Sequence, residues 1–151
     1  MKLIQKNKKA YFDYVIEEDI ESGIMLKGDE VKSIRNGNVS IKESYAKINR
    51  ETLEAYIYDM NIDCNPFGTH VKLSPKRDRK LLLHKNQIKR LLKKIEEKGL
   101  TLIPIEIYLN DRNIVKLKLA LCKGKKVFDK RETIKRRDFE RDSERENKIR
   151  T

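Results

Sequence analysis

The fold can be predicted outward from TLIPIEIYLNDRNIVKLKLAL, residues 101–121. Two runs rich in apolar and β-branched residues, Thr101–Leu109 and Ile114–Leu121, flank the polar segment Asn110–Asn113. Such side chains pack well on a pleated sheet, and a short polar segment between two such runs is typical of an antiparallel hairpin. These residues therefore predict two paired strands.

A second hairpin is predicted upstream of the first. The runs Ser40–Ile48 and Leu53–Met60 alternate apolar and polar residues, and Asn49–Thr52 separates them. Alternation with a period of two is the signal of a strand with one buried face. Further strands are predicted nearer the N-terminus, at Tyr11–Ile16 and Gly23–Leu26.

Two helices are predicted between and beside these strands. The longer one has an apolar stripe at helical spacing, formed by Ile88, Leu91, Leu92 and Ile95. We expect His84 to cap its start with Gln87 and Gly99 to end it. A shorter helix is predicted over Gly28–Arg35. Two hairpins and flanking helices predict a mainly β fold, an antiparallel OB-like β-barrel that is closed or partly closed.

Composition indicates a polyanionic partner. Among 151 residues, 36 Lys and Arg face 24 Asp and Glu, giving a net charge of +12. Binding to phosphates releases counterions and favours such a chain thermodynamically. Apolar runs such as Leu81–Leu83 are too short to span a bilayer, and Met1–Lys6 does not resemble a signal peptide. We expect a cytoplasmic protein without a membrane partner.

The last residues differ from the rest. We divide the chain into an OB-like domain at residues 1–122 and a basic tail at residues 123–151, where apolar residues are sparse. Ordering a backbone costs about 1–2 kcal/mol per residue, and the tail has little apolar surface to offset that cost. It contains no proline and many good helix formers. We expect it to be disordered alone and helical against a partner.

No catalytic group, cofactor or metal site is predicted. Cys64 and Cys122 have no neighbouring Cys or His, and the two histidines are not paired with a nucleophile. The carboxylates are more concentrated, at Glu17, Glu18, Asp19 and Glu21. With a histidine they would suit a metal-dependent RNA hydrolase. Because three of them are consecutive, a strand would point them to opposite faces, and a solvated acidic turn is the preferred interpretation.

Basic clusters point to RNA. They lie at Lys6–Lys9, Lys76–Lys80 and Lys89–Lys94. The aromatic residues nearby are Tyr11, Phe12, Tyr14 and Tyr45. Cations bind phosphates and rings stack on unpaired bases, so this combination favours an RNA-binding surface. A ribosomal or assembly protein of similar build is an alternative, and it would copurify with small ribosomal subunits.

A series of short motifs is more specific. In order they are Asn7–Ala10, Asp13–Tyr14, Gly23–Arg35 with its Glu-Val-Lys-Ser core, Ser44–Ala46, Thr69–His70, Arg79–His84, Gly124–Lys126, Asp129–Arg131 and Ile134–Lys135. This order resembles the small protein B (SmpB) family, the tmRNA-binding, or SsrA-binding, proteins of bacterial trans-translation. The resemblance covers nearly the whole chain.

The resemblance implies an OB-like barrel that binds the tRNA-like domain of tmRNA and delivers it to stalled ribosomes. By matching positions, it assigns tmRNA binding to Asn7, Glu21 and Leu82. We expect phosphates to be bound by Lys8, Lys9, Lys32 and Arg35. Alanyl-tRNA synthetase and elongation factor Tu are implied as partners through tmRNA.

The resemblance also implies that the tail binds small-subunit RNA. Residues implied at the decoding centre are Lys125, Lys126, Asp129, Lys130 and Arg131. Those implied to become helical in the empty mRNA channel are Ile134, Lys135, Arg137 and Phe139. The chain departs from the family pattern at Phe128, where Tyr or His is common, at Phe139, where Trp is common, and at Cys122, where a small residue is common.

Overall fold

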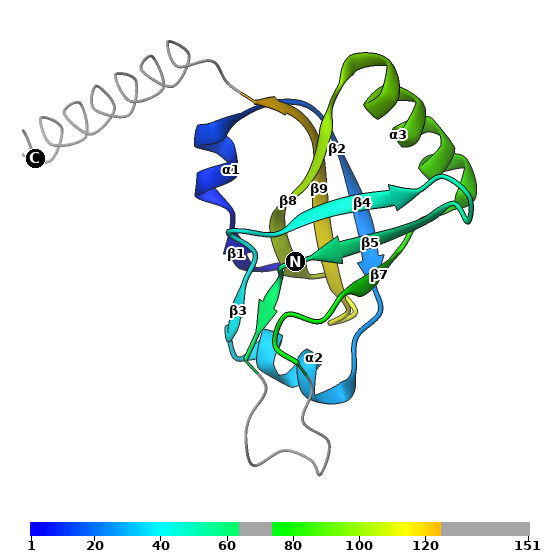
Figure 1. Cartoon of the computed structure of the whole chain (residues 1–151). Coiled ribbons are helices and arrows are strands. Elements are labelled where there is room, and N and C mark those ends of the chain that lie inside the picture. The colour runs from blue at the N-terminus through cyan, green and yellow to red at the C-terminus, as the bar shows by residue number, and fades with distance from the viewer. Residues whose placement is uncertain (64–73, 125–151) are drawn as a thin grey trace, which may run out of the picture.

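The computed structural model describes residues 1–63 and 74–124 (Figure 1). The elements in chain order are β1 (Lys2–Lys6), α1 (Lys8–Asp13), β2 (Tyr14–Ile24), α2 (Gly28–Arg35), β3 (Val39–Ser40), β4 (Tyr45–Asn49), β5 (Glu54–Tyr58), β6 (Asn61–Ile62), β7 (Arg79–Leu82), α3 (Lys85–Lys98), β8 (Thr101–Leu109) and β9 (Val115–Gly124). The predictions for the tail from Lys125 to Phe139, and those for Cys64 and His70, lie outside the described residues.

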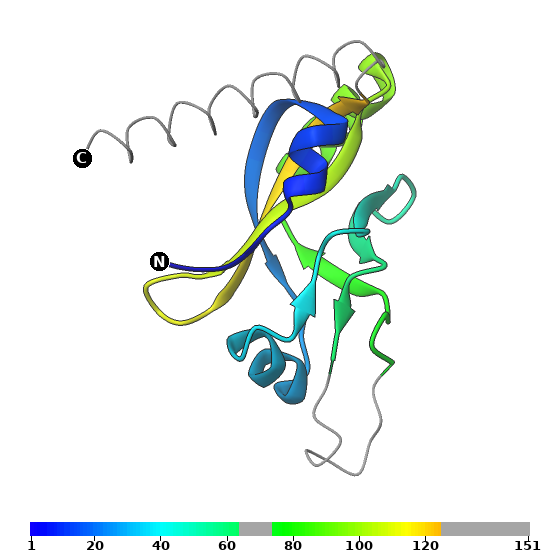
Figure 2. The same ribbon diagram turned by 90° about the vertical axis from the view of Figure 1, so that its left-hand side faces the viewer.

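Antiparallel pairing closes the main sheet into a ring. The strands follow the order β8-β4-β5-β7-β2-β9, and β9 pairs with β8 again. One edge of β8 is shared, because β4 pairs at Leu102 and β1 pairs along Glu106–Leu109. In both Figures 1 and 2, α1 and α2 lie at opposite ends of this ring. The predicted fold class, mainly β with flanking helices, is confirmed.

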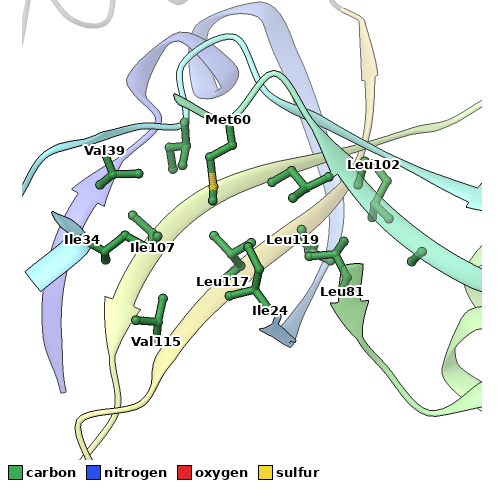
Figure 3. Packing of buried hydrophobic residues seen from close by; sticks show 14 of the residues in the cluster. Ile24, Ile34, Val39, Met60, Leu81, Leu102, Ile107, Val115, Leu117 and Leu119 are labelled. Atoms are coloured by element: carbon green, nitrogen blue, oxygen red, sulfur yellow. The ribbon is translucent and has the colours of Figure 1, made fainter. Parts of the chain in front are cut away.

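The core fills the inside of the ring. Alternate residues of β8 and β9 point inward, including Leu102, Ile107, Leu117 and Leu119, and each of these four is at most 1% exposed (Figure 3). A smaller apolar cluster lies outside the ring around α1, formed by Ala10, Ile103, Ile105, Ala120 and Cys122. Burial in that cluster raises the pKa of the Cys122 thiol to about 12, which keeps this thiol protonated and unreactive at neutral pH.

Both predicted hairpins and both predicted helices are present. β8 pairs with β9 and β4 pairs with β5, each in antiparallel register. The first upstream run is divided, because a turn closed by Ser44 separates β3 from β4. α3 begins after His84, whose backbone N–H donates to Gln87 Oε1 at 3.0 Å, and it ends at Gly99 with φ +62°. That left-handed conformation favours glycine.

The strand predicted at Tyr11–Ile16 is wrong in its first half. Lys8–Asp13 form the helix α1, because Asn7 caps its start by accepting a hydrogen bond from the Ala10 backbone N–H at 3.1 Å. Tyr14 is already extended and begins β2. The helix cap formed by Asn7 therefore outweighs the strand preference of the aromatic residues that follow it.

The predicted acidic turn is also wrong. Glu17–Asp19 lie within β2, which runs continuously along β9 with a bulge between Ile16 and Glu18. The strand accommodates these carboxylates because Glu18 forms ion pairs with Arg90 and Lys94 of α3. These hydrogen bonds lower the pKa of the Glu18 carboxyl, the one from Lys94 most strongly. β2 therefore joins the strands predicted separately at Tyr11–Ile16 and Gly23–Leu26, and it ends at Ile24, before the predicted end at Leu26.

A buried ion pair joins α2 to β7. The side chains of Glu30 and Arg79 are both 0% exposed, and Arg79 Nε donates to Glu30 Oε2 at 2.6 Å. The other guanidinium nitrogens donate to the backbone oxygens of Met60 at 2.8 Å and Pro75 at 3.1 Å. Arg77 provides a second cation for the same carboxylate. These contacts therefore fix α2, β7 and the backbone at Met60 and Pro75 to one another.

The charge of Glu30 is maintained against desolvation. Burial raises the pKa of this carboxyl, but hydrogen bonds from Arg77, the backbone N–H of Lys27 and Arg79 outweigh burial and lower it overall. A carboxyl with a lowered folded-state pKa stabilises the fold fully above its unfolded pKa of about 4.3. That contribution is lost as the pH falls through the folded-state pKa.

Glu30→Gln should lower the free energy of unfolding by about 3–5 kcal/mol at pH 7, because it leaves the Arg79 cation buried without its counter-charge. The difference between wild type and variant should shrink as the pH falls below about 4.3, where Glu30 of the unfolded chain takes up a proton, and it should vanish only below the lowered folded-state pKa. Urea denaturation across this pH range measures both effects. Glu43→Gln, which removes an exposed ion pair with Lys9, is the control and should change stability far less. Equal losses in the two variants would contradict the account.

Candidate nucleic-acid interface

Strand register brings residues from four strands together on the outside of the ring. Residues directly opposite in antiparallel strands project to the same face. Gly23 of β2 pairs with Leu82 of β7 on one side and with Lys116 of β9 on the other, and Lys116 pairs with Tyr108 of β8. Their chain neighbours, such as Ile24, Leu81 and Leu117, belong to the core. These four residues therefore face outward.

A second level of outward residues lies beside the first. Glu21 pairs with Lys118, Lys118 pairs with Glu106, and Glu106 pairs with Lys6 of β1. Charges alternate along this level, and Lys118 Nζ lies 3.5 Å from Glu106 Oε2. We call the two levels together the outer face, which consists of Lys6, Glu21, Gly23, Leu82, Glu106, Tyr108, Lys116 and Lys118.

Leu82 can lie against Gly23 on this face because Gly23 has no side chain. A Cβ added at Gly23 would lie 3.1 Å from Leu82 Cβ, closer than side chains usually approach. Leu82 therefore lies over the Gly23 backbone while 52% of its surface stays exposed. Met25, two residues further along the chain, is 54% exposed. An apolar surface held on a rigid sheet can pack against the face of a base or an apolar ring.

Glu21 is oriented by a tyrosine from across the sheet. The Tyr108 hydroxyl donates to Glu21 Oε2, although β9 lies between their two strands. Tyr108 is 4% exposed, whereas Glu21 is exposed. Burial raises the pKa of Tyr108 above its ordinary value, and the hydrogen bond to Glu21 raises it further. The phenol therefore stays protonated and donates, and the accessible carboxylate can accept hydrogen bonds from amino or hydroxyl groups.

Asn7 is buried rather than presented to a partner. It is 3% exposed, and its amide nitrogen donates to Ile41 O at 3.1 Å and to Pro104 O at 3.0 Å. Its side-chain oxygen caps α1 through Ala10. In this conformation the side chain joins α1 to β8 and to the segment before β4, which makes Asn7 a positioning residue. The predicted role of Asn7 in tmRNA binding stays a prediction.

The predicted phosphate-binding cations lie at two ends of the ring. Lys32 and Arg35 are exposed on α2, where Arg35 Nη2 donates to Asn113 O at 3.1 Å. Lys8 and Lys9 are exposed on α1 at the opposite end, and Lys9 Nζ lies 2.8 Å from Glu43 Oε1 (Figures 1 and 2). The fold therefore does not gather all the predicted RNA-binding residues into one patch. Only Glu21 and Leu82 share the outer face.

The acidic residues considered for a metal-dependent hydrolase are divided between partners. Glu17 and Glu18 form ion pairs with α3, and Glu21 accepts from Tyr108. Within residues 1–63 and 74–124, no three His, Cys, Asp or Glu side chains lie together as a group that could hold a metal ion. The hydrolase hypothesis thus has no assembled centre in the described part of the chain. Among the described helices, none is long and apolar enough to cross a membrane.

These features define a class of protein: a small basic β-ring domain with charged and exposed apolar side chains gathered on the outside of its sheet. Comparison with known proteins is more specific. The family model described as SmpB protein matches residues 4–149. The chain therefore belongs to the SmpB family.

Individual relatives agree with this assignment. An SsrA-binding protein of Caldicellulosiruptor saccharolyticus is 52% identical over 140 residues, covering 93% of this chain and 87% of that protein. One from Treponema denticola is 49% identical over 150 residues, covering 99% and 96%. A solved structure described as "tmRNA-SmpB: a journey to the center of the bacterial ribosome" is 45% identical with a TM-score of 0.66, covering 82% of this chain and 85% of that one.

Tyr108→Phe should lower the free energy of unfolding by about 1 kcal/mol, the typical net value of one hydrogen bond, while keeping the buried ring. Glu21→Ala removes the acceptor of the same bond. In a double-mutant cycle measured by urea denaturation, the two substitutions should couple by about 1 kcal/mol. Strictly additive effects would show that the two side chains do not interact.

Proposed function

We propose that this chain binds SsrA RNA, also called tmRNA, and acts with it on the ribosome in trans-translation. The observation that carries this proposal is the match to the SmpB family over residues 4–149. The curated relatives are named SsrA-binding proteins, and a related solved structure is described as tmRNA-SmpB in the ribosome. The protein acts by binding, in the cytoplasm, and we propose no catalytic step.

The outer face is proposed as the surface for the tRNA-like domain of SsrA RNA. Glu21 accepts hydrogen bonds from base amino groups or ribose hydroxyls. A carboxylate suits these donors rather than phosphate, which carries the same negative charge. Leu82 packs against an unstacked base. Lys32 and Arg35 bind phosphates next to this face, because β2 leads directly into α2. Lys8 and Lys9 bind phosphates at the other end, and Asn7 positions the α1 that carries them.

Glu21→Ala and Leu82→Ala should each weaken binding of SsrA RNA at least tenfold, a loss of roughly 1.4 kcal/mol. Neither side chain contributes to the core, so folding should be retained. Gel shift at one fixed salt concentration measures the effect. Val15→Ala, an apolar residue 47% exposed at the far end of β2, is the control for Leu82, and Glu97→Ala, an exposed carboxylate on α3, is the control for Glu21. The outer face is not the binding surface if the control variants lose as much affinity.

The tail is proposed to act on the ribosome. We propose that the residues at the decoding centre are Lys125, Lys126, Phe128, Asp129, Lys130 and Arg131. Those proposed to follow the empty mRNA channel as a helix are Ile134, Lys135, Arg137 and Phe139. Basic side chains bind the phosphates of ribosomal RNA. A tail that becomes ordered only on its partner can enter the mRNA channel only when the channel is empty, so its ordering distinguishes an empty channel from an occupied one. Alanyl-tRNA synthetase and elongation factor Tu are proposed as partners through the bound tmRNA.

Deleting the chain from Lys125 onward should leave SsrA RNA binding within about twofold, because the outer face is intact, and should abolish tagging on stalled ribosomes. A translation assay with a message lacking a stop codon measures tagging, and gel shift on the same preparation measures binding. The division of labour is contradicted by an equal loss of both activities. Substituting Ile149→Ser alone is the control for a nonspecific effect of changing the tail.

A further inference from the structure

A second outward surface lies on β4, β5 and β7, which are neighbours in the ring (Figure 1). Tyr45 pairs with Tyr58, and Lys47 pairs with Tyr56, which pairs in turn with Lys80. The core residues that alternate with them along these strands are Ala46, Ala55, Ile57 and Leu81. The five paired residues therefore face outward together, and we call Tyr45, Lys47, Tyr56, Tyr58 and Lys80 the tyrosine platform.

The rings of the platform are held in place but not covered. All three tyrosines are half-buried, so each keeps part of its surface in solvent. The rings of Tyr45 and Tyr58 stack with their centroids 5.5 Å apart and an interplanar angle of 23°. The Tyr56 hydroxyl donates to Glu54 Oε2 at 2.8 Å, and this bond raises the pKa of Tyr56. The phenol therefore stays uncharged, and rings fixed in this way lose little freedom when a flat ligand stacks on them.

Cations stand beside these rings. Lys47 Nζ lies 5.5 Å from the centroid of the Tyr45 ring, and no carboxylate pairs with Lys47 within residues 1–63 and 74–124. Lys80 Nζ lies 3.7 Å from Glu54 Oε1, the carboxylate that also accepts from Tyr56. Because Lys80 balances the charge of Glu54, the platform together with Glu54 carries one excess positive charge. Its charge therefore favours an anionic ligand.

Strand preference alone does not account for this surface. Tyrosine suits exposed strand positions, and an opposed aromatic pair such as Tyr45 and Tyr58 stabilises a sheet. Tyr56 differs from this pair, because a lysine lies opposite it on each side. The strands that carry these lysines run about 5 Å from that of Tyr56. Aromatic rings next to cations form the surface on which proteins bind unpaired nucleotides, with bases on the rings and phosphates on the cations.

The platform adjoins the outer face along β7. Lys80 and Leu82 are two residues apart on this strand, so both project outward from it. None of the five platform residues belongs to the outer face, yet an RNA that lies over Leu82 can continue onto Lys80 and Tyr56 along the same sheet. This continuity favours one RNA that spans both surfaces.

We propose that the tyrosine platform stacks unpaired bases of the same SsrA RNA that the outer face holds, while Lys47 and Lys80 bind the neighbouring phosphates. This inference rests on the proposed function, because it takes the RNA at the outer face as given. The two surfaces then have different tasks. The outer face recognises particular groups through Glu21 and Leu82, whereas the platform accepts any base, since every base has a face that can stack.

Two RNA probes, tested with the full chain, separate the platform from the outer face. One is SsrA RNA, and the other is a short labelled oligouridylate, which has no fold of its own. Tyr56→Leu combined with Tyr58→Leu should weaken the binding of both probes about fivefold or more, because leucine keeps an apolar side chain but offers no ring. Tyr56→Phe combined with Tyr58→Phe keeps both rings and is the matched control, expected to bind within about twofold of the wild type. Circular dichroism checks that both double variants are folded.

Lys47 provides a second measurement that changes no ring and therefore does not depend on the folding of the tyrosine variants. Lys47→Gln should reduce the slope of log affinity against log salt for the oligouridylate by about 0.7, the value for one phosphate contact to a single strand. Lys98→Gln, an exposed lysine at the end of α3, is the control and should leave this slope unchanged. Glu21→Ala should weaken the binding of SsrA RNA but not of the oligouridylate.

Equal affinity of the wild type and the double leucine variant for both probes would overturn the inference, as would an unchanged salt slope in Lys47→Gln. Unchanged binding of SsrA RNA together with weakened binding to ribosomes would also overturn it, by assigning the platform to ribosomal RNA. Failure of the proposed function looks different. The wild-type chain would then bind the oligouridylate but not SsrA RNA, which would also refute SsrA RNA as the ligand of the platform.

Discussion

The buried contact between Glu30 and Arg79 constrains the rest of the structure. Arg79 is the first residue of β7, and its guanidinium binds α2 through Glu30 and the chain corner through Met60 and Pro75. β7 is a short strand that fills the position between β5 and β2. Without β7 the ring would open, and Leu82 would not lie beside Gly23. The buried Glu30–Arg79 ion pair is thus linked to the outer face through β7, the strand that carries both Arg79 and Leu82.

Ring closure converts strand register into a surface. Inward positions of β2, β7, β8 and β9 form the core, so their alternate positions necessarily face outward together. Glu21 and Leu82 come from strands far apart in sequence, and register alone places them on one face. Tyr108 then fixes the direction of the carboxylate, and Gly23 makes room for the leucine. The exposed side chains of Glu21 and Leu82 are therefore preorganised, the first by the buried Tyr108 and the second by the space that the missing side chain of Gly23 leaves.

Sequence patterns predicted the elements with strong local signals, namely both hairpins, α2 and α3. They failed where tertiary contacts decide: α1 depends on the cap by Asn7, and β1 and β7 are short, charged strands stabilised by their neighbours. Glu21 and Leu82 were named from resemblance to a family. Tyr108, Gly23 and the Glu30–Arg79 pair were missed, because their roles depend on register between distant strands.

The central claim is that the outer face meets SsrA RNA, and site-specific crosslinking tests it most directly. Met25 is exposed beside Gly23, so a photoreactive methionine analogue there samples the outer face without altering it. The same group at Glu97, exposed on α3, samples a different side of the ring. In the complex of full chain with SsrA RNA, the account predicts a crosslink to the tRNA-like domain from position 25 and none from position 97. A crosslink from position 97 alone would contradict it.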